Sequence, residues 1–407
     1  MRTFLFRLAA AATAAGLLAG GAGCGPVLAG RAAEPVVIGA DLALTGSGSA
    51  LGTVHHRALL LRIRQLNQQG LAGDRRLELR VRDNRSEPQV AATNLAELAA
   101  DPAVTAIVTD ACGQCMVAAA GRLAEHRVPA IALAAGDQVA RPVAQRRYVF
   151  QLAPDAGEDA DLIAAELVRD RAATVGLVTT ADGYGEAGLR ELTAAAARGG
   201  FALVVHRRVV AGDPAGLAGA AASVAGWRPA TGFVPDPQPP PGPDAVVVWL
   251  PAPAAGQLAA ELRRAGYRGR LHLDAIGAGE VELPTQALAG ASLVFTDTPV
   301  ADQLIAATPA RAARQTWFRD YLARHGSYHA QASWAADAIA VIADAVRRAG
   351  LAGRPPDREV LRDQIESTRR LDGLTGLIRY SADQHSGLHP QSLTLLVARD
   401  GRWHPAG

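Results

Sequence analysis

Residues 76–110, RLELRVRDNRSEPQVAATNLAELAADPAVTAIVTD, contain the pattern that decides the fold class. The segment begins with an alternating strand (76–84), continues with helical periodicity (87–101) and ends in an apolar, β-branched run (103–110). Such an apolar run is typical of a strand that is covered on both faces of a parallel sheet. The segment therefore predicts a strand–helix–strand unit with parallel strands.

The same alternation extends over most of the chain. Strand runs separated by helical stretches continue from residue 35 to about 156, and the pattern then restarts and runs to about 277. Three helical stretches (308–326, 330–350 and 357–367) follow, before extended segments joined by Gly- and Asp-bearing turns. This order predicts an α/β protein with two doubly wound, Rossmann-like lobes. A ligand would bind at the carboxyl ends of the strands.

The N-terminus has the pattern of an export signal. A positively charged start precedes an apolar run (8–19) that is shorter than the ~20 residues of a membrane-spanning helix. Small residues then lead to Cys24, as in a bacterial lipobox, although Gly21 stands where that motif usually has Leu. We expect a signal peptide (1–23), lipidation of Cys24 and a membrane tether (24–34). Ordinary cleavage without lipidation is the alternative.

Length and charge narrow the function classes further. A chain of 407 residues is too long for one typical core, so two domains are expected. The net charge is +2 with acids and bases mixed along the chain, which gives no basic stripe for nucleic acid. Proline cannot donate to a sheet ladder, so the proline-dense stretch 228–243 is expected to be a surface loop.

Several segments occur together in the order and spacing of one known family. They are VVIGADLALTGSGSALG (36–52), RVRDNRSEPQVAATNLAELAADPAVTAIV (80–108), VPAIALAAG (128–136), DGYGEAGL (182–189) and LDGLTGLIRYSADQHSGLH (371–389). Over residues 35–405 the chain resembles the type I periplasmic binding proteins, specifically the Leu/Ile/Val-binding family of ABC-transport receptors. Each segment alone is weak evidence for the family, but their order and spacing together are specific to it.

The resemblance implies two lobes that are joined by three crossovers and close on a ligand. The crossovers would fall near residues 153–155, 274–277 and 377–381. Lobe 1 would then contain 35–153 and 277–376, and lobe 2 would contain 154–276 and 377–407.

The resemblance also implies a function. The protein would capture a small polar ligand, either amino-acid-like, an amide or an organic acid, and deliver it to an ABC permease in the membrane. It would need no cofactor. The alternative with the same fold is a sensor whose closed form is read by a signalling partner.

In amino-acid-binding members, the loops after the third and fourth strands hold the ligand carboxylate with hydroxyls and helix N-terminal N–H groups. Here Gly113 and Gln114 replace the hydroxyl residues of the first loop, and Ala135 and Gly136 occupy the second. The following Asp137 would repel a carboxylate. The side-chain part of that grip is missing, so we expect a ligand that is not a standard amino acid.

Four other positions complete the candidate site. Tyr184 matches the family tyrosine that packs over the ligand, and a one-residue shift from Ala275 makes Asp274 the acid that neutralises the ligand ammonium. Leu51 lies near a family aromatic position, and Ser47 offers a hydroxyl at the cleft edge. The alternatives are a packing tyrosine, an aspartate that caps a turn and a serine that merely suits a turn.

Cys112 and Cys115 form a C-x-x-C at a strand-to-helix junction, where a helix N-terminus lowers a thiol pKa. The motif alone leaves open a redox couple, half of a zinc site or a structural disulfide. In several family members a cysteine at the position of Cys112 pairs with one in the loop after the second strand, but DNRSEP (83–88) has none. In an oxidising compartment we expect Cys112 to pair with Cys115.

Enzyme signatures are weak. The glycines after the first strand have the spacing G-x-G-x-x-x-G rather than that of a dinucleotide-binding loop. The ten histidines are scattered without metal-ligand spacing, and no G-x-S-x-G elbow is present. We therefore expect neither a metal nor an enzyme. A thiol oxidoreductase that uses the C-x-x-C is the remaining enzymatic alternative.

Overall fold

The computed structural model describes residues 33–210, 212–229, 242–280, 283 and 286–406. The expected signal peptide, Cys24, nearly all of the tether and most of the proline-dense loop lie outside these residues. The described elements belong to one unit of the chain, 34–407. None of their helices combines the length and the apolar character that crossing a membrane requires.

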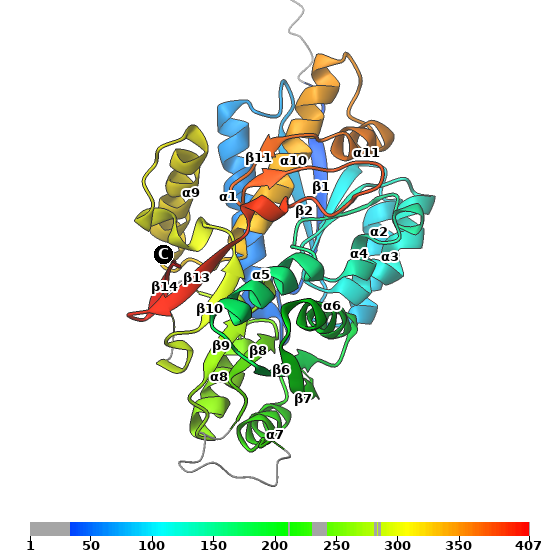
Figure 1. Ribbon diagram of the computed structural model, residues 1–407. Coiled ribbons are helices and arrows are strands. Elements are labelled where there is room, and N and C mark those ends of the chain that lie inside the picture. The colour runs from blue at the N-terminus through cyan, green and yellow to red at the C-terminus, as the bar shows by residue number, and fades with distance from the viewer. Residues whose placement is uncertain (1–32, 211, 230–241, 281–282, 284–285, 407) are drawn as a thin grey trace, which may run out of the picture. The chain divides into compact units, whose positions relative to one another are not determined.

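Five parallel strands form the first sheet (Figure 1). In spatial order they are β2 (Leu77–Asp83), β1 (Val36–Leu42), β3 (Val104–Thr109), β4 (Ala130–Ala132) and β5 (Val149–Gln151). The associated helices are α1 (Ser49–Gln69), α2 (Pro88–Ala100), α3 (Gly113–Glu125), α4 (Asp137–Ala140), η1 (Val143–Gln145), α10 (Ala332–Leu351) and α11 (Arg358–Glu366). Helices cover the sheet, so β3 and β4 are buried nearly throughout and show no alternation.

Seven strands form the second sheet, with five parallel strands and an antiparallel pair at one edge. In spatial order they are β14 (Arg402–Pro405), β13 (Thr394–Arg399), β10 (Ser292–Phe295), β9 (Arg270–Leu273), β8 (Ala245–Trp249), β6 (Thr174–Thr180) and β7 (Ala202–Val209). Its helices are α5 (Ala156–Arg169), α6 (Gly183–Gly199), α7 (Pro214–Ala225) and α8 (Ala254–Arg264). The predicted fold class, an α/β protein with two wound sheets, is confirmed.

The remaining described elements belong to neither sheet nor to the helices named above. They are η2 (Ala275–Gly277), η3 (Gln286–Leu288), η4 (Thr298–Gln303), α9 (Pro309–His325), β11 (Leu371–Asp372), β12 (Leu377–Ile378) and η5 (Pro390–Ser392). The chain passes from β5 directly to α5, at the position expected for the first crossover. Ser386 forms a parallel bridge with Gln151, so the segment before β13 runs beside β5.

The helix ends follow from local residue types. The Asp182 carboxylate accepts a hydrogen bond from the Gly185 N–H at the start of α6, and the Thr308 hydroxyl accepts one from the Arg311 N–H at the start of α9. Helix α6 ends at Gly200, whose φ of +74° suits glycine. These caps place the start of α6 at the carboxyl edge of the second sheet.

The position of β10 differs from the sequence expectation. Residues 277–376 were expected in lobe 1, but β10 lies between β9 and β13 in the second sheet. All four of its residues are buried, which this central position explains. The chain therefore returns to the first sheet after β10, through η4 and α9. The other lobe boundaries remain predictions.

Candidate functional site

Loops from the two sheets meet at the carboxyl ends of their strands. A Cβ added to Gly136, in the loop after β4, would lie 3.8 Å from the Tyr184 Cα at the start of α6. The Gln138 side chain lies against Gly183, where an added Cβ would be only 1.5 Å from its Nε2. The two predicted site residues Gly136 and Tyr184 are therefore neighbours, although they come from different sheets.

An ion pair joins the same two regions. The Arg190 guanidinium on α6 donates to the Asp137 carboxylate on α4. From the sequence, Asp137 was expected only to repel a carboxylate ligand. In the structure this side chain has a cationic partner from the second sheet.

Tyr184 and Asp274 are in direct contact. The Tyr184 hydroxyl donates to Oδ2 of Asp274, and this oxygen also accepts the Ile276 N–H at 3.1 Å. A third residue, Asp159 in the first turn of α5, accepts the Ala275 N–H on its Oδ2 at 3.0 Å. The structure thus places Asp274 beside the predicted tyrosine and adds Asp159, which the sequence analysis missed.

Burial dominates the protonation of these three groups. Burial raises the pKa of Asp274 to about 7, although the hydrogen bond from Tyr184 and backbone N–H groups act in the opposite direction. Burial and the charge of Asp274 raise the pKa of Asp159 well above its usual value. Burial and Asp274 also raise the pKa of the Tyr184 hydroxyl. Around neutral pH this cluster therefore carries less negative charge than two free carboxylates would.

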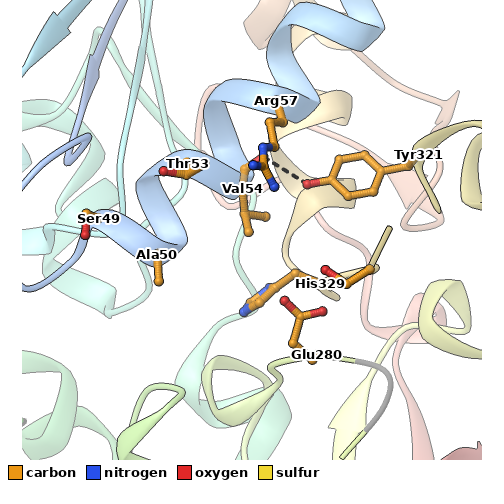
Figure 2. Close-up of a pocket in the computed structure, with 9 residues that line it drawn as sticks. Ser49, Ala50, Thr53, Val54, Arg57, Glu280, Tyr321 and His329 are labelled. Atoms are coloured by element: carbon orange, nitrogen blue, oxygen red, sulfur yellow. Dashed lines mark hydrogen bonds between the residues drawn. The ribbon is translucent and has the colours of Figure 1, made fainter. Parts of the chain in front are cut away.

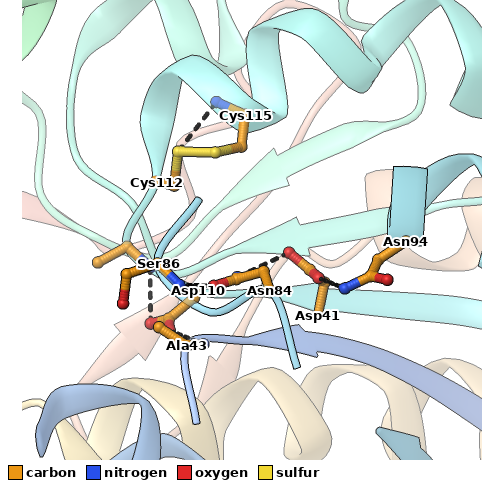
Figure 3. The surroundings of a disulfide bond; sticks show 9 residues. Asp41, Ala43, Asn84, Ser86, Asn94, Asp110, Cys112 and Cys115 are labelled. Carbon is orange, nitrogen blue, oxygen red and sulfur yellow. Dashed lines mark hydrogen bonds between the residues drawn. A yellow bond between two sulfur atoms is a disulfide. The ribbon is translucent and has the colours of Figure 1, made fainter. Parts of the chain in front are cut away.

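The disulfide between Cys112 and Cys115 stands at the start of α3 (Figure 3). Cys112 is the N-cap, and its Sγ accepts the Cys115 N–H at 3.1 Å. A Cβ added to Gly113 would lie 3.3 Å from the Ala135 carbonyl oxygen, so the first and second predicted loops contact each other. The Gln114 side chain is exposed. The bonded sulfurs and the packed glycine hold the N-terminus of α3 in place.

Two buried aspartates lie beneath these loops (Figure 3). Asp110 accepts the Ala43 N–H at 2.8 Å on one oxygen, and its other oxygen is 2.7 Å from His55 Nδ1. Asp41 accepts amide N–H groups of Asn84 and Asn94 at 2.9 and 2.8 Å. The loops after β1, β2 and β3 are thereby joined by satisfied buried hydrogen bonds.

A cavity of about 320 Å³ opens beside α1 (Figure 2). It is lined by Ser49, Ala50, Thr53, Val54, Arg57, Glu280, Tyr321, Ser327 and His329. The Tyr321 hydroxyl donates to the Val54 carbonyl at 3.4 Å. Burial lowers the pKa of His329 to about 3, with a further contribution from His55, so this ring is neutral at pH 7.

The cavity includes one hydroxyl of the segment after β1 and leaves out others, among them the predicted site residue Ser47. Ser49 lines it, whereas the Thr45 hydroxyl donates to Asp83 at 2.8 Å and Ser47 is exposed. Leu51 packs against the main core cluster. Ala50, Thr53 and Arg57 occur at helical spacing after Ser49, which was a signal for one shared face of α1. Their neighbours from other segments could not be read from that spacing.

The described residues contain no group of three or more His, Cys, Asp or Glu side chains that could hold a metal ion.

Comparisons with known proteins agree with this architecture. A model of the periplasmic binding protein family matches residues 35–401. No curated protein matches the chain. The family match thus covers every strand of both sheets except β14, and it includes the loops that meet between them.

Solved structures share the fold at low sequence identity. An extracellular ligand-binding receptor from Rhodopseudomonas palustris HaA2 has a TM-score of 0.77 and 22% identity, covering 91% of this chain and 99% of its own. The leucine-binding protein LivK from Thermotoga maritima has a TM-score of 0.73 and 21% identity, covering 91% and 98%. LivJ from Streptococcus pneumoniae, a branched-chain amino acid transporter substrate-binding protein in complex with isoleucine, has a TM-score of 0.72 and 19% identity, covering 91% and 97%.

Proposed function

The chain belongs to the periplasmic binding protein family, and on this basis we propose that it captures a small polar molecule between its two lobes and delivers it to an ABC permease. The family implies a ligand-binding receptor with an extracytoplasmic location. Lipidation of Cys24 would keep the receptor at the membrane surface, beside its permease.

The observation that carries this proposal is the meeting of Gly136 and Tyr184 at the carboxyl ends of two separate sheets. Ligands of open α/β sheets bind at this edge. A molecule held there contacts both lobes at once, so its binding energy favours the closed arrangement. Glu280, which lines the cavity beside α1, follows Asp274 by one short segment of the chain.

We propose that the ligand differs from leucine and isoleucine, after which LivK is named and with which LivJ was solved, respectively. Loops with Gly113, Gln114, Ala135 and Gly136 offer backbone N–H groups but no hydroxyl for a carboxylate. On the second sheet, Tyr184 and Asp274 supply a ring and an acid. We propose an amino-acid-like or amide ligand that is recognised mainly through its nitrogen end, in preference to an organic acid that lacks one.

A thermal-shift panel of amino acids, amides and short-chain organic acids tests the receptor proposal. At least one compound should raise the melting temperature of the mature chain, because a ligand that binds only the folded state stabilises it. Tyr184→Ala should reduce that shift, since the ring and the hydroxyl both face the proposed site. If no compound in the panel shifts the melting temperature and none co-purifies, the receptor proposal fails.

A further inference from the structure

A second cavity, of about 500 Å³, lies at the C-terminal end of α11. One wall is formed by the end of α11 and the link that follows it, and the other by segment 379–382 after β12. Its lining shares no residue with the cavity beside α1 and includes none of the predicted site residues. The cavity is therefore a candidate site for a different ligand.

Two arginines line this cavity, one from each wall. Arg369 belongs to the link after α11, and Arg379 belongs to the segment after β12. The Tyr380 N–H donates to the Thr368 carbonyl at 2.8 Å, next to the antiparallel pair of β11 and β12. Arg379 and Arg369 are the next residues inward on the two segments, so they face each other. Like charges in facing positions repel each other, which an anion between them would relieve.

Neither arginine has a counter-charge in the described part of the chain. No carboxylate of that part pairs with Arg369 or Arg379, and neither guanidinium donates a hydrogen bond to it. The acid in the described lining, Glu366, is already neutralised, because Arg362 donates to both of its oxygens and His385 Nε2 lies 3.2 Å from Oε1. The lining thus presents two positive charges that no residue of the lining balances.

The acids nearest in sequence do not supply the missing charge. Asp372 and Asp383 are exposed and lie outside the lining. The Ser381 hydroxyl lines the cavity and makes no hydrogen bond to a described residue. The Ser367 hydroxyl is already engaged, since it donates to the Gln364 carbonyl at 3.1 Å. Ser381 is therefore the neutral donor that remains for a ligand.

This donor set suits an oxyanion. A guanidinium presents its N–H groups as a planar fork that binds two oxygens of a phosphate or carboxylate at once. Two forks and a hydroxyl match the several oxygens of a tetrahedral phosphate group better than a halide, which is a single acceptor. The volume of the cavity is in the range of pockets that hold small organic ligands.

We propose that Arg369 and Arg379 form a site for a phosphate group, either free phosphate or the phosphate of a small monoester, with Ser381 as a further donor. The bound anion bridges the two walls. It therefore holds the end of α11 against the segment that leads from β12 towards β13 of the second sheet. The site does not depend on the proposed receptor function, because the two share no residue.

Calorimetric titration of the full mature chain with inorganic phosphate tests the site, with sodium chloride at the same ionic strength as the control titrant. Phosphate should bind saturably and raise the melting temperature, because it binds the folded state, and chloride should do neither. Glycerol 3-phosphate distinguishes the two sources of the group. Tighter binding than that of inorganic phosphate assigns the site to a monoester, and equal or weaker binding assigns it to free phosphate.

Matched variants locate the binding. Arg369→Gln and Arg379→Gln should each weaken phosphate binding about 10-fold or more, because each removes one charged fork. Both side chains are exposed, so the melting temperature without phosphate should not fall, and either variant tests the site if the other does not fold. Arg370→Gln, at an exposed arginine outside the lining, is the control and should change the affinity by less than about twofold.

Two results would overturn the site. One is phosphate binding that is no tighter than that of chloride. The other is an equal loss of affinity in Arg370→Gln and Arg379→Gln, which would mean that the general surface charge, and not this cavity, attracts the anion.

Discussion

The two sheets present buried acids to the same region in opposite ways. On the first sheet, Asp110 and Asp41 have both oxygens satisfied by backbone N–H groups, a histidine and two asparagines. On the second sheet, Asp159 and Asp274 each leave one oxygen without a partner in the described chain. The first pair is complete without a ligand, and the second is not.

This difference separates acids whose hydrogen bonds are complete within the fold from acids that keep an unpaired oxygen. Burial alone would raise the pKa of Asp110, but the charge and hydrogen bond of His55 and two backbone N–H groups bring it below its usual value. The Ala275 N–H lowers the pKa of Asp159, but burial and the charge of Asp274 outweigh it. Satisfied acids stabilise the loops that carry the site, whereas the unpaired oxygens of Asp159 and Asp274 cost stability.

The largest expected change in stability follows from replacing an acid of the first sheet. Asp110→Ala removes the acceptor for the Ala43 and Ala111 N–H groups and leaves buried His55 without its partner. We expect the free energy of unfolding to fall by about 3–5 kcal/mol, measured by chemical denaturation. Asp161→Ala, at an exposed position, is the control and should change it by less than about 1 kcal/mol. Equal effects of the two substitutions would remove the distinction between the sheets.

Replacing an acid of the second sheet is expected to increase the stability of the ligand-free protein rather than to decrease it. The pKa of Asp274 is raised to about 7, so the unfolded chain loses this proton near pH 4, before the folded chain does. Folding therefore becomes less favourable as the pH rises from about 4 to about 7, and an amide at this position escapes that loss. Asp274→Asn should stabilise the ligand-free protein by on the order of 2 kcal/mol at about pH 8, with a smaller gain at about pH 5.

Thermal melting of wild type and Asp274→Asn across this pH range measures that difference. A gain that does not depend on pH would mean that the raised pKa of Asp274 is not its source. A loss of stability that grows with pH would contradict the description of the second-sheet acids.

The smallest expected change in stability follows from removing the disulfide at the start of α3. It closes a loop of only a few residues, so the stabilisation from restricting the unfolded chain is limited to about 2 kcal/mol. The double variant Cys112→Ser and Cys115→Ser should lower the melting temperature modestly and leave ligand binding measurable. Intact-mass analysis of the unreduced protein should give a mass lower by two hydrogen atoms than that of the reduced form. Two free thiols in the exported protein would contradict the disulfide between Cys112 and Cys115.

Much of the fold could be predicted, because parallel strands covered on both faces leave long apolar runs in the sequence. The sheet to which β10 belongs could not, since a buried strand of four residues has the same composition in either sheet. Asp274 was identified by resemblance. Asp159 was not, because it stands in the acidic stretch AGEDADL (156–162), which looks like an ordinary solvated first turn of a helix. Its burial depends on η2, which is distant in sequence.

The cavity beside α1 was hidden for a similar reason. Glu280, Tyr321 and His329 reach it from three separate segments. Single-sequence spacing can place residues on one helix face, but it does not show which distant segment faces them.

Mass identification of the small molecule released from natively purified protein tests the central claim most directly. The account predicts a bound small polar compound with a nitrogen group, present in wild type and in Asp161→Asn but lost from Tyr184→Ala. A bound compound without a nitrogen group, or full retention in Tyr184→Ala, would contradict the account.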